Sequence, residues 1–139
     1  MSIEVNDESG VDNDLAALSA LSRHVLEALR IHPLAELSVL LVDVETMTRL
    51  HVQWMDEPGP TDVLSFPQDD EEHGGVRILG DVVMAPAVAA RNNPDDPAAE
   101  LRLLLVHGIL HILGYDHETA EERAAMWARQ ERYSGVRTP

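Results

Sequence analysis

The segment from residue 97 to residue 113, PAAELRLLLVHGILHIL, most constrains how this chain can fold. Asp96 is a good N-cap before it, Pro97 suits the first helical position, and Glu100 lies near the positive end of the helix dipole. Apolar residues fall on nearly every side of the helix, and such a helix has to be buried. Gly114 then suits the left-handed residue that closes a helix. We therefore expect a central, buried helix over 97–113.

The rest of the chain predicts short strands and helices around that helix. The hydrophobic periodicity and the turn residues between segments place strands over 2–6, 37–43, 62–66 and 78–85, and helices over 14–31, 44–55, 86–92 and 118–134. The order predicts an α+β fold with a mixed sheet of about four strands, covered by helices mainly on one face. No repeat or linker divides the 139 residues, so we expect one domain over residues 1–139.

The composition excludes several classes of protein. The chain has no cysteine, which removes disulfides, thiolate zinc sites and cysteine nucleophiles. No run of residues reaches the roughly 18 apolar residues of a membrane span, and the N-terminus does not resemble a signal peptide, so we expect a cytoplasmic protein without membrane contact. With a net charge of −15, the chain lacks the basic character of most nucleic-acid binders. An RNA partner would therefore need a local basic groove or a metal to offset the repulsion.

Three histidines have the spacing of a catalytic metal site. His107 and His111 are four residues apart, which places them on one face of a helix with their bases about 5–6 Å apart. Gly114 turns the chain, so that His117 can return to the same point. Three protein ligands leave a tetrahedral zinc ion one open position for water, as in catalytic sites. Zinc is the first candidate, although histidine also suits nickel, copper and iron. Histidines without a metal, or a structural metal, are the alternatives.

Gly108 distinguishes this pattern from that of the zinc peptidases. In the motif H-E-x-x-H-x-x-G-x-x-H the glutamate deprotonates the zinc-bound water, and Gly108 stands in its place. Peptide hydrolysis by that route is therefore disfavoured, whereas a bound metal still lowers the pKa of its water to about 7 and polarises a phosphoryl oxygen. A glycine inside a helix costs about 1 kcal/mol relative to alanine. We therefore expect either close packing or an approaching substrate at this position.

Two stretches of the chain resemble signatures of the YbeY family, the bacterial endoribonucleases of ribosomal-RNA maturation. They are HGILHILGYDH (107–117) and PTDVLSFP (60–67), and LGDVVMAP (79–86) supports them as the L-G-D-containing strand of the family. The resemblance implies a single-domain α+β fold and a metal, first of all zinc, on the three histidines. It also implies single-strand-specific RNA cleavage in 16S rRNA 3′-end maturation and small-subunit quality control. Its implied partners are ribosomal RNA and ribosome-assembly proteins, not DNA.

One position departs from the family pattern. Family members often carry an arginine shortly before the second signature, and Met55 occupies that position here. A methionine cannot bind phosphate, and Arg49 and Arg77 are the candidates to replace the arginine. An alternative function is therefore a ribosome-assembly factor that binds rRNA or partner proteins with little or no nuclease activity. A hydrolase of another ester is a third possibility.

Several polar residues have two interpretations each. Asp116 would either orient a ligand histidine or cap the next helix, and Asp81 would either line the cleft or be a plain carboxylate on a strand. Thr61 and Ser65 would offer hydroxyls to RNA phosphate or bond within the turn and the strand. The acidic segment 68–77 is expected to be a mobile loop. We expect Trp54 and Trp127 in the core. Four further histidines are expected on the surface or in loops: His24, His32, His51 and His73.

Overall fold

A computed structural model describes residues 1–59, 61–68 and 77–136. Residues 69–76, which make up most of the loop predicted over 68–77 and include His73, lie outside this part of the chain. The elements follow one another as β1 (Ser2–Asp7), α1 (Leu15–Ala28), β2 (Ala35–Leu41), α2 (Val44–Met55), β3 (Val63–Pro67), β4 (Arg77–Met84), α3 (Pro86–Asn92), α4 (Pro97–Ile112) and α5 (Ala120–Ser134). This order and every predicted element are confirmed.

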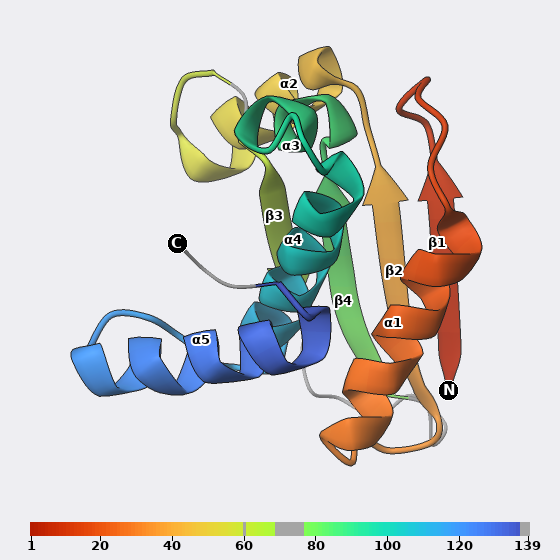
Figure 1. Cartoon of the computed structure of the whole chain (residues 1–139), viewed down its shortest axis with the longest axis vertical. Coiled ribbons are helices and arrows are strands. Elements are labelled where there is room, and N and C mark those ends of the chain that lie inside the picture. Colours follow the sequence, from red (N-terminus) through yellow and green to blue (C-terminus); the bar gives the residue numbers. More distant parts are fainter. Residues whose placement is uncertain (60, 69–76, 137–139) are drawn as a thin grey trace.

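The four strands form one mixed sheet in the order β1-β2-β4-β3. β1 pairs in parallel with β2, and β2 with β4, whereas β3 runs antiparallel to β4 at one edge. The helices α1 and α4 lie in front of the sheet and α5 crosses at the lower end of α4, while α2 lies behind the upper end of the sheet (Figure 1). The predicted α+β fold with a mixed four-stranded sheet, covered by helices mainly on one face, is therefore confirmed.

The main hydrophobic core lies between this sheet and α4. Four residues of α4 have no exposed surface: Leu105, Val106, Ile109 and Leu110. The Asp96 side chain caps the helix by accepting a hydrogen bond of 3.1 Å from the Ala99 backbone N–H. Gly114, with a φ of +98°, ends it as expected. A smaller core on the other face of the sheet packs Met47 of α2 against Leu64 and Val83.

Several element boundaries differ from the prediction by a few residues. The strand predicted over 37–43 lies two residues earlier, since Asp43 instead caps α2 by accepting a hydrogen bond of 2.7 Å from the Thr46 backbone N–H. The helix predicted over 14–31 ends at Ala28, and Arg30 adopts a φ of +58° that no helix continues through. The helix predicted over 118–134 begins at Ala120, because Thr119 caps it by accepting a hydrogen bond from the Glu122 backbone N–H.

The prediction for one of the two tryptophans is wrong. Trp54 lies near the end of α2 with 60% of its surface exposed, where Phe66 of the edge strand β3 meets its ring edge to face. Trp127 does pack against the main core as predicted. Two of the further histidines, His24 and His32, are exposed as expected, whereas His51 is half-buried and donates to the Gly59 carbonyl oxygen across 2.9 Å.

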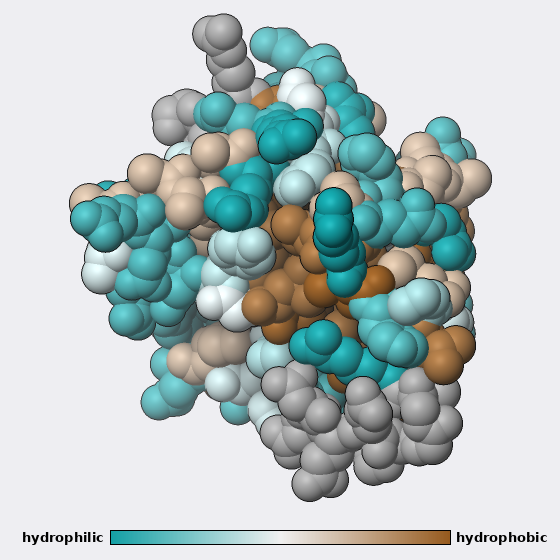
Figure 2. All heavy atoms as spheres, turned by 90° about the horizontal axis from the view of Figure 1, so that it is seen from below, coloured by the Kyte–Doolittle hydropathy of each residue, from teal (hydrophilic) through white to brown (hydrophobic). Residues whose placement is uncertain are grey.

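The lower end of the molecule carries hydrophobic surface. Seen from below, hydrophobic residues gather at the centre of this end, with hydrophilic residues around them (Figure 2). Leu34 and Ile78, which stand near the starts of β2 and β4, are large hydrophobic residues with exposed side chains.

Within the described residues, no helix combines the length and the apolar character that crossing a membrane requires.

Candidate metal centre

The three predicted histidines converge at the lower end of α4. His107 and His111 lie one turn apart in its second half, and His117 follows in the loop that Gly114 opens. One ring nitrogen from each residue lies within 4.8 Å of those of the other two. The ring centroids are separated by 4.6 Å for His107 and His111, and by 5.1 Å for His111 and His117. Small side-chain rotations would bring all three nitrogens to the roughly 2.0–2.1 Å that a zinc ion requires.

A buried glutamine holds the first of these rings. The Oε1 atom of Gln130, a residue of α5 that is only 3% exposed, lies 2.7 Å from Nδ1 of His107. An amide oxygen only accepts, so Nδ1 carries the hydrogen and Nε2 keeps its lone pair. Histidines that ligate metals are commonly oriented in this way by a hydrogen bond to the second ring nitrogen. Nε2 of His107 is therefore the ring nitrogen that is available as a ligand.

The surroundings lower the pKa of two of the three imidazoles. Burial is the largest cause that lowers the pKa of His107, opposed by the hydrogen bond with Gln130, and His117 lowers it further. Burial also lowers the pKa of His111, followed by the neighbouring His107 and His117. Metal ligation requires the neutral imidazole, because the ring nitrogen must offer a lone pair. The environment thus favours the protonation state that binds an ion.

The histidines open onto a cavity of about 330 Å³ beside β3. Its wall is mostly apolar and is made by Met55, Val63, Leu64, Ser65, Pro67, His107 and His111. Arg49 and Arg77, the candidates to replace the arginine of the family, do not line this cavity. Arg49 instead donates to Thr46 Oγ1 across 3.3 Å, and Arg77 begins β4. Among the described lining residues there is no lysine, arginine or carboxylate.

Gly108 allows α4 to approach the sheet closely. A Cβ atom added there would lie 2.8 Å from Cγ1 of Val82 and 3.2 Å from Oγ of Ser65. The Ser65 hydroxyl donates a hydrogen bond of 3.0 Å to the Gly108 carbonyl oxygen. Close packing therefore accounts for the glycine, and Ser65 joins β3 to α4 beside the histidines while it also faces the cavity.

The other predicted site residues lie farther from the cluster or act on it indirectly. Asp116 accepts a hydrogen bond of 2.7 Å from the backbone N–H of His117, which shapes the loop that carries this histidine. It does not cap the next helix, because Thr119 does. Asp81 lines a groove on the opposite face of the sheet, and Thr61 precedes β3 without lining the histidine cavity.

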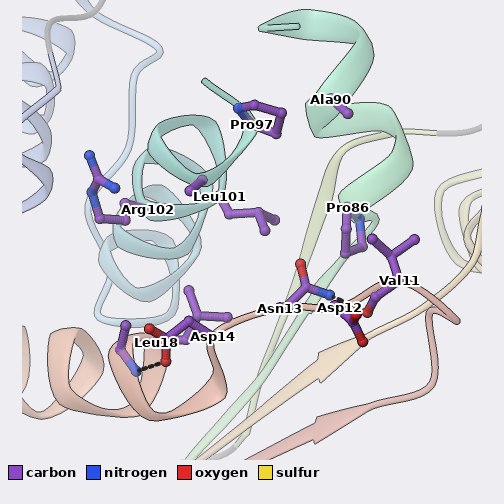
Figure 3. A pocket seen from close by; sticks show the side chains of 12 residues that line it. Val11, Asp12, Asn13, Asp14, Leu18, Pro86, Ala90, Pro97, Leu101 and Arg102 are labelled. Carbon is purple, nitrogen blue, oxygen red and sulfur yellow. Dashed lines mark hydrogen bonds between the residues drawn. The ribbon is translucent and has the colours of Figure 1, made fainter. Parts of the chain in front are cut away.

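A larger cavity of about 560 Å³ lies at the other end of α4. It is bounded by the segment before α1, by α3 and by the first turns of α4 (Figure 3). Val11, Pro86 and Leu101 face it, and Arg102 stands at its side, where Nε lies 3.4 Å from the Ser134 carbonyl oxygen. None of the three histidines lines it.

Proteins of known family resemble the chain over nearly its whole length. A family model described as endoribonuclease YbeY matches residues 3–135. A protein from Streptomyces coelicolor with that name is 51% identical over 142 residues, which cover 94% of this chain and 86% of the relative. One from Thermobifida fusca is 54% identical over 139 residues, covering 94% and 90%. The solution structure of TM1509 from Thermotoga maritima has 26% identity and a TM-score of 0.67, covering 95% of this chain and 86% of that one.

Proposed function

The chain belongs to the YbeY family of endoribonucleases, and on that premise we propose that it cleaves single-stranded RNA with the help of a metal ion. The proposed substrate is the 3′ region of immature 16S rRNA, in small-subunit maturation and quality control. The proposed partners are ribosomal RNA and ribosome-assembly proteins in the cytoplasm, and residues 1–139 act as one hydrolase domain. The observation that carries the proposal is the convergence of three imidazoles beside an open cavity.

The residues present fit a zinc ion. His107, His111 and His117 would hold it, and their nitrogens already lie within 4.8 Å of one another. When bound, zinc supplies a Lewis acid that polarises a phosphoryl oxygen and acidifies a water molecule. Gln130 fixes the His107 ring, and Asp116 fixes the backbone of His117. Such supporting hydrogen bonds commonly change metal affinity about 10- to 100-fold when they are removed.

The side chains around the histidines define what the chain itself contributes. Val63, Leu64 and Pro67 form an apolar wall that limits the access of water to one side of the site. No described lining residue is a carboxylate, so the described part of the wall offers no carboxylate to take the proton of the attacking oxygen. Both a water molecule and the 2′-hydroxyl of the RNA remain candidates for the attacking group.

Cleavage of a single-stranded RNA oligonucleotide by purified protein tests the proposal. We expect cleavage to stop with a chelator, to return when zinc is added, and to be absent in His111→Ala under both conditions. His24→Ala is the matched control, since His24 is exposed on α1 outside the cluster. Cleavage that survives both the chelator and His111→Ala would contradict a metal-dependent site on these histidines.

A specific observation favours a second candidate function. Met55 lines the histidine cavity, and no described residue of its wall is cationic. With a net charge of −15, the chain offers phosphate little attraction outside the metal. A ribosome-assembly factor that binds rRNA or partner proteins with little nuclease activity would show this combination. Stable binding to immature small subunits without any cleavage, in protein fully loaded with zinc, would favour it.

A further inference from the structure

Trp54 presents an aromatic face to solvent close to the candidate metal centre. The side chain is 60% exposed, although the Phe66 ring meets it edge to face with centroids 6.0 Å apart and an interplanar angle of 73°. Phe66 is half-buried in β3, so it holds the indole against the sheet without covering it. A large aromatic ring that is both oriented and exposed is a common feature of binding surfaces.

The ring borders a groove of about 540 Å³ on the sheet face opposite α4. Leu50 and Phe66 make part of its wall apolar, while Ser38, Gln68 and Asp81 add hydrogen-bonding groups. No lysine or arginine is among the described lining residues, and the Asp81 carboxylate would repel a phosphate. A flat, uncharged group with polar edges fits these surroundings, and a nucleobase is such a group.

The groove adjoins the histidine cavity across β3. Side chains alternate between the two faces of a strand, and in β3 Ser65 faces the histidines while Phe66 faces the groove. At the end of α2, Met55 lines the histidine cavity and Trp54 lines the groove, and consecutive Cα atoms are only about 3.8 Å apart. β3 is also an edge strand of the described sheet. A single strand of RNA can therefore cross that edge from one site to the other.

We propose that this groove is a nucleobase subsite, in which a base adjacent to the scissile phosphate stacks on Trp54 and turns its polar edge toward Asp81. The inference rests on the proposed function, because it is the phosphate at the histidines that brings the neighbouring nucleotide to the groove. A carboxylate accepts hydrogen bonds from the exocyclic amino groups of cytosine, adenine and guanine, whereas uracil has no amino group and offers only its ring N3–H. The subsite therefore favours bases with amino groups. It also selects single strands, because a paired base cannot leave its stack to reach the indole.

Binding of single-stranded oligonucleotides tests the subsite separately from cleavage. Fluorescence anisotropy is measured with the zinc-loaded full chain and a labelled 2′-O-methyl phosphorothioate oligonucleotide, which resists cleavage, and cleavage kinetics are measured separately with the unmodified RNA. We expect Trp54→Ala to weaken binding about 10-fold, within the range for base–aromatic stacking. It should raise KM by a similar factor with little change in kcat. Trp54→Phe should restore most of the affinity. Val52→Ala is the matched control, since Val52 is an exposed residue of the same helix that lines neither site.

Base preference supplies a second, independent readout. The intact protein should bind oligocytidine more tightly than oligouridine, and Asp81→Asn should reduce that difference. If Trp54→Ala binds RNA as tightly as Val52→Ala does, the subsite is refuted even when cleavage is intact, and a role of the groove in binding protein would then be favoured. If binding depends on Trp54 while no variant or metal yields cleavage, the subsite stands and the proposed nuclease activity fails. An intact chain that binds neither oligonucleotide would overturn both.

Discussion

Replacing Gln130 by methionine would show whether the buried amide prepares His107 for a metal. The side chain of Gln130 is 3% exposed, so water cannot take over the hydrogen bond of 2.7 Å that its Oε1 accepts from Nδ1 of His107. Methionine has a similar length and fills the same space, but it offers no comparable acceptor. The exchange therefore removes the hydrogen bond and leaves the packing of α5 largely intact.

The size of the effect follows from the groups that lose a partner. An unsatisfied buried donor costs about 1–3 kcal/mol, and the His107 ring also becomes free to rotate away from the ligating orientation. Loss of such a supporting hydrogen bond weakens metal binding about 10- to 100-fold, which corresponds to about 1.4–2.8 kcal/mol. We therefore expect the zinc Kd of Gln130→Met to rise by that factor.

The assay is a competition titration in which the protein and a chromophoric chelator share zinc near neutral pH. Gln130→Glu serves as the control, because a carboxylate restores the acceptor and should bind zinc at least as tightly as the native glutamine. Circular dichroism verifies that both variants are folded. If folded Gln130→Met binds zinc within twofold of the native protein, then Nε2 of His107 does not depend on Gln130 and the assignment of the ring is refuted.

Three further outcomes follow from the same geometry. Gly108→Ala should lower the free energy of unfolding by about 1 kcal/mol in urea, because overpacking against Val82 outweighs the gain of roughly 1 kcal/mol in helix propensity; a stabilised variant would contradict the close packing. Met55→Arg should lower the KM for single-stranded RNA several-fold, since a guanidinium pairs with phosphate, whereas Met55→Gln should not; equal effects would exclude a charge effect. The pKa values of His107 and His111 in the folded protein lie below the ordinary 6.5, so the unfolded chain binds more protons than the folded one as the pH falls. Metal-free protein should therefore lose stability below about pH 6.5. A urea midpoint that stays level from pH 7.5 to 5.5 would contradict this.

The fold was predictable from the sequence wherever a segment carried its own boundary signals. The helix over 97–113 has an N-cap at Asp96, a proline at its first position and a glycine after its end, and the structure places it within one residue of the prediction. The exposed position of Trp54 was not predictable in the same way. Met47, Leu50 and Trp54 share one helix face by spacing, but Met47 packs into the smaller core, whereas the indole lies at the edge of the sheet against the Phe66 ring of β3. How far the neighbouring sheet extends decides whether such a residue is buried, and the local periodicity of the sequence carries no information about that extent.

The candidate metal centre was likewise predictable from the sequence only in part. His107, His111 and His117 lie within eleven residues of one another, so local helix geometry and one turn suffice to predict that they meet. Gln130 lies 23 residues from its partner, on another helix. Its only signal in the sequence is a polar residue four positions after Met126 on the buried face of α5, and that face can be recognised only once the packing of α5 on α4 is known.

The contact between α4 and the sheet links the stability of the core to the geometry of the site. The space that Gly108 leaves lets the helix approach Val82, and Ser65 hydrogen-bonds to the helix at that same residue, one position after His107. Ser65 also lines the histidine cavity. A shift of α4 away from β3 would therefore widen the cavity and, at the same time, break the hydrogen bond between Ser65 and the helix. His117 depends instead on the turn at Gly114 and on Asp116. Substitutions that loosen the core should therefore displace His107 and His111 relative to His117, and metal affinity should fall before the fold is lost.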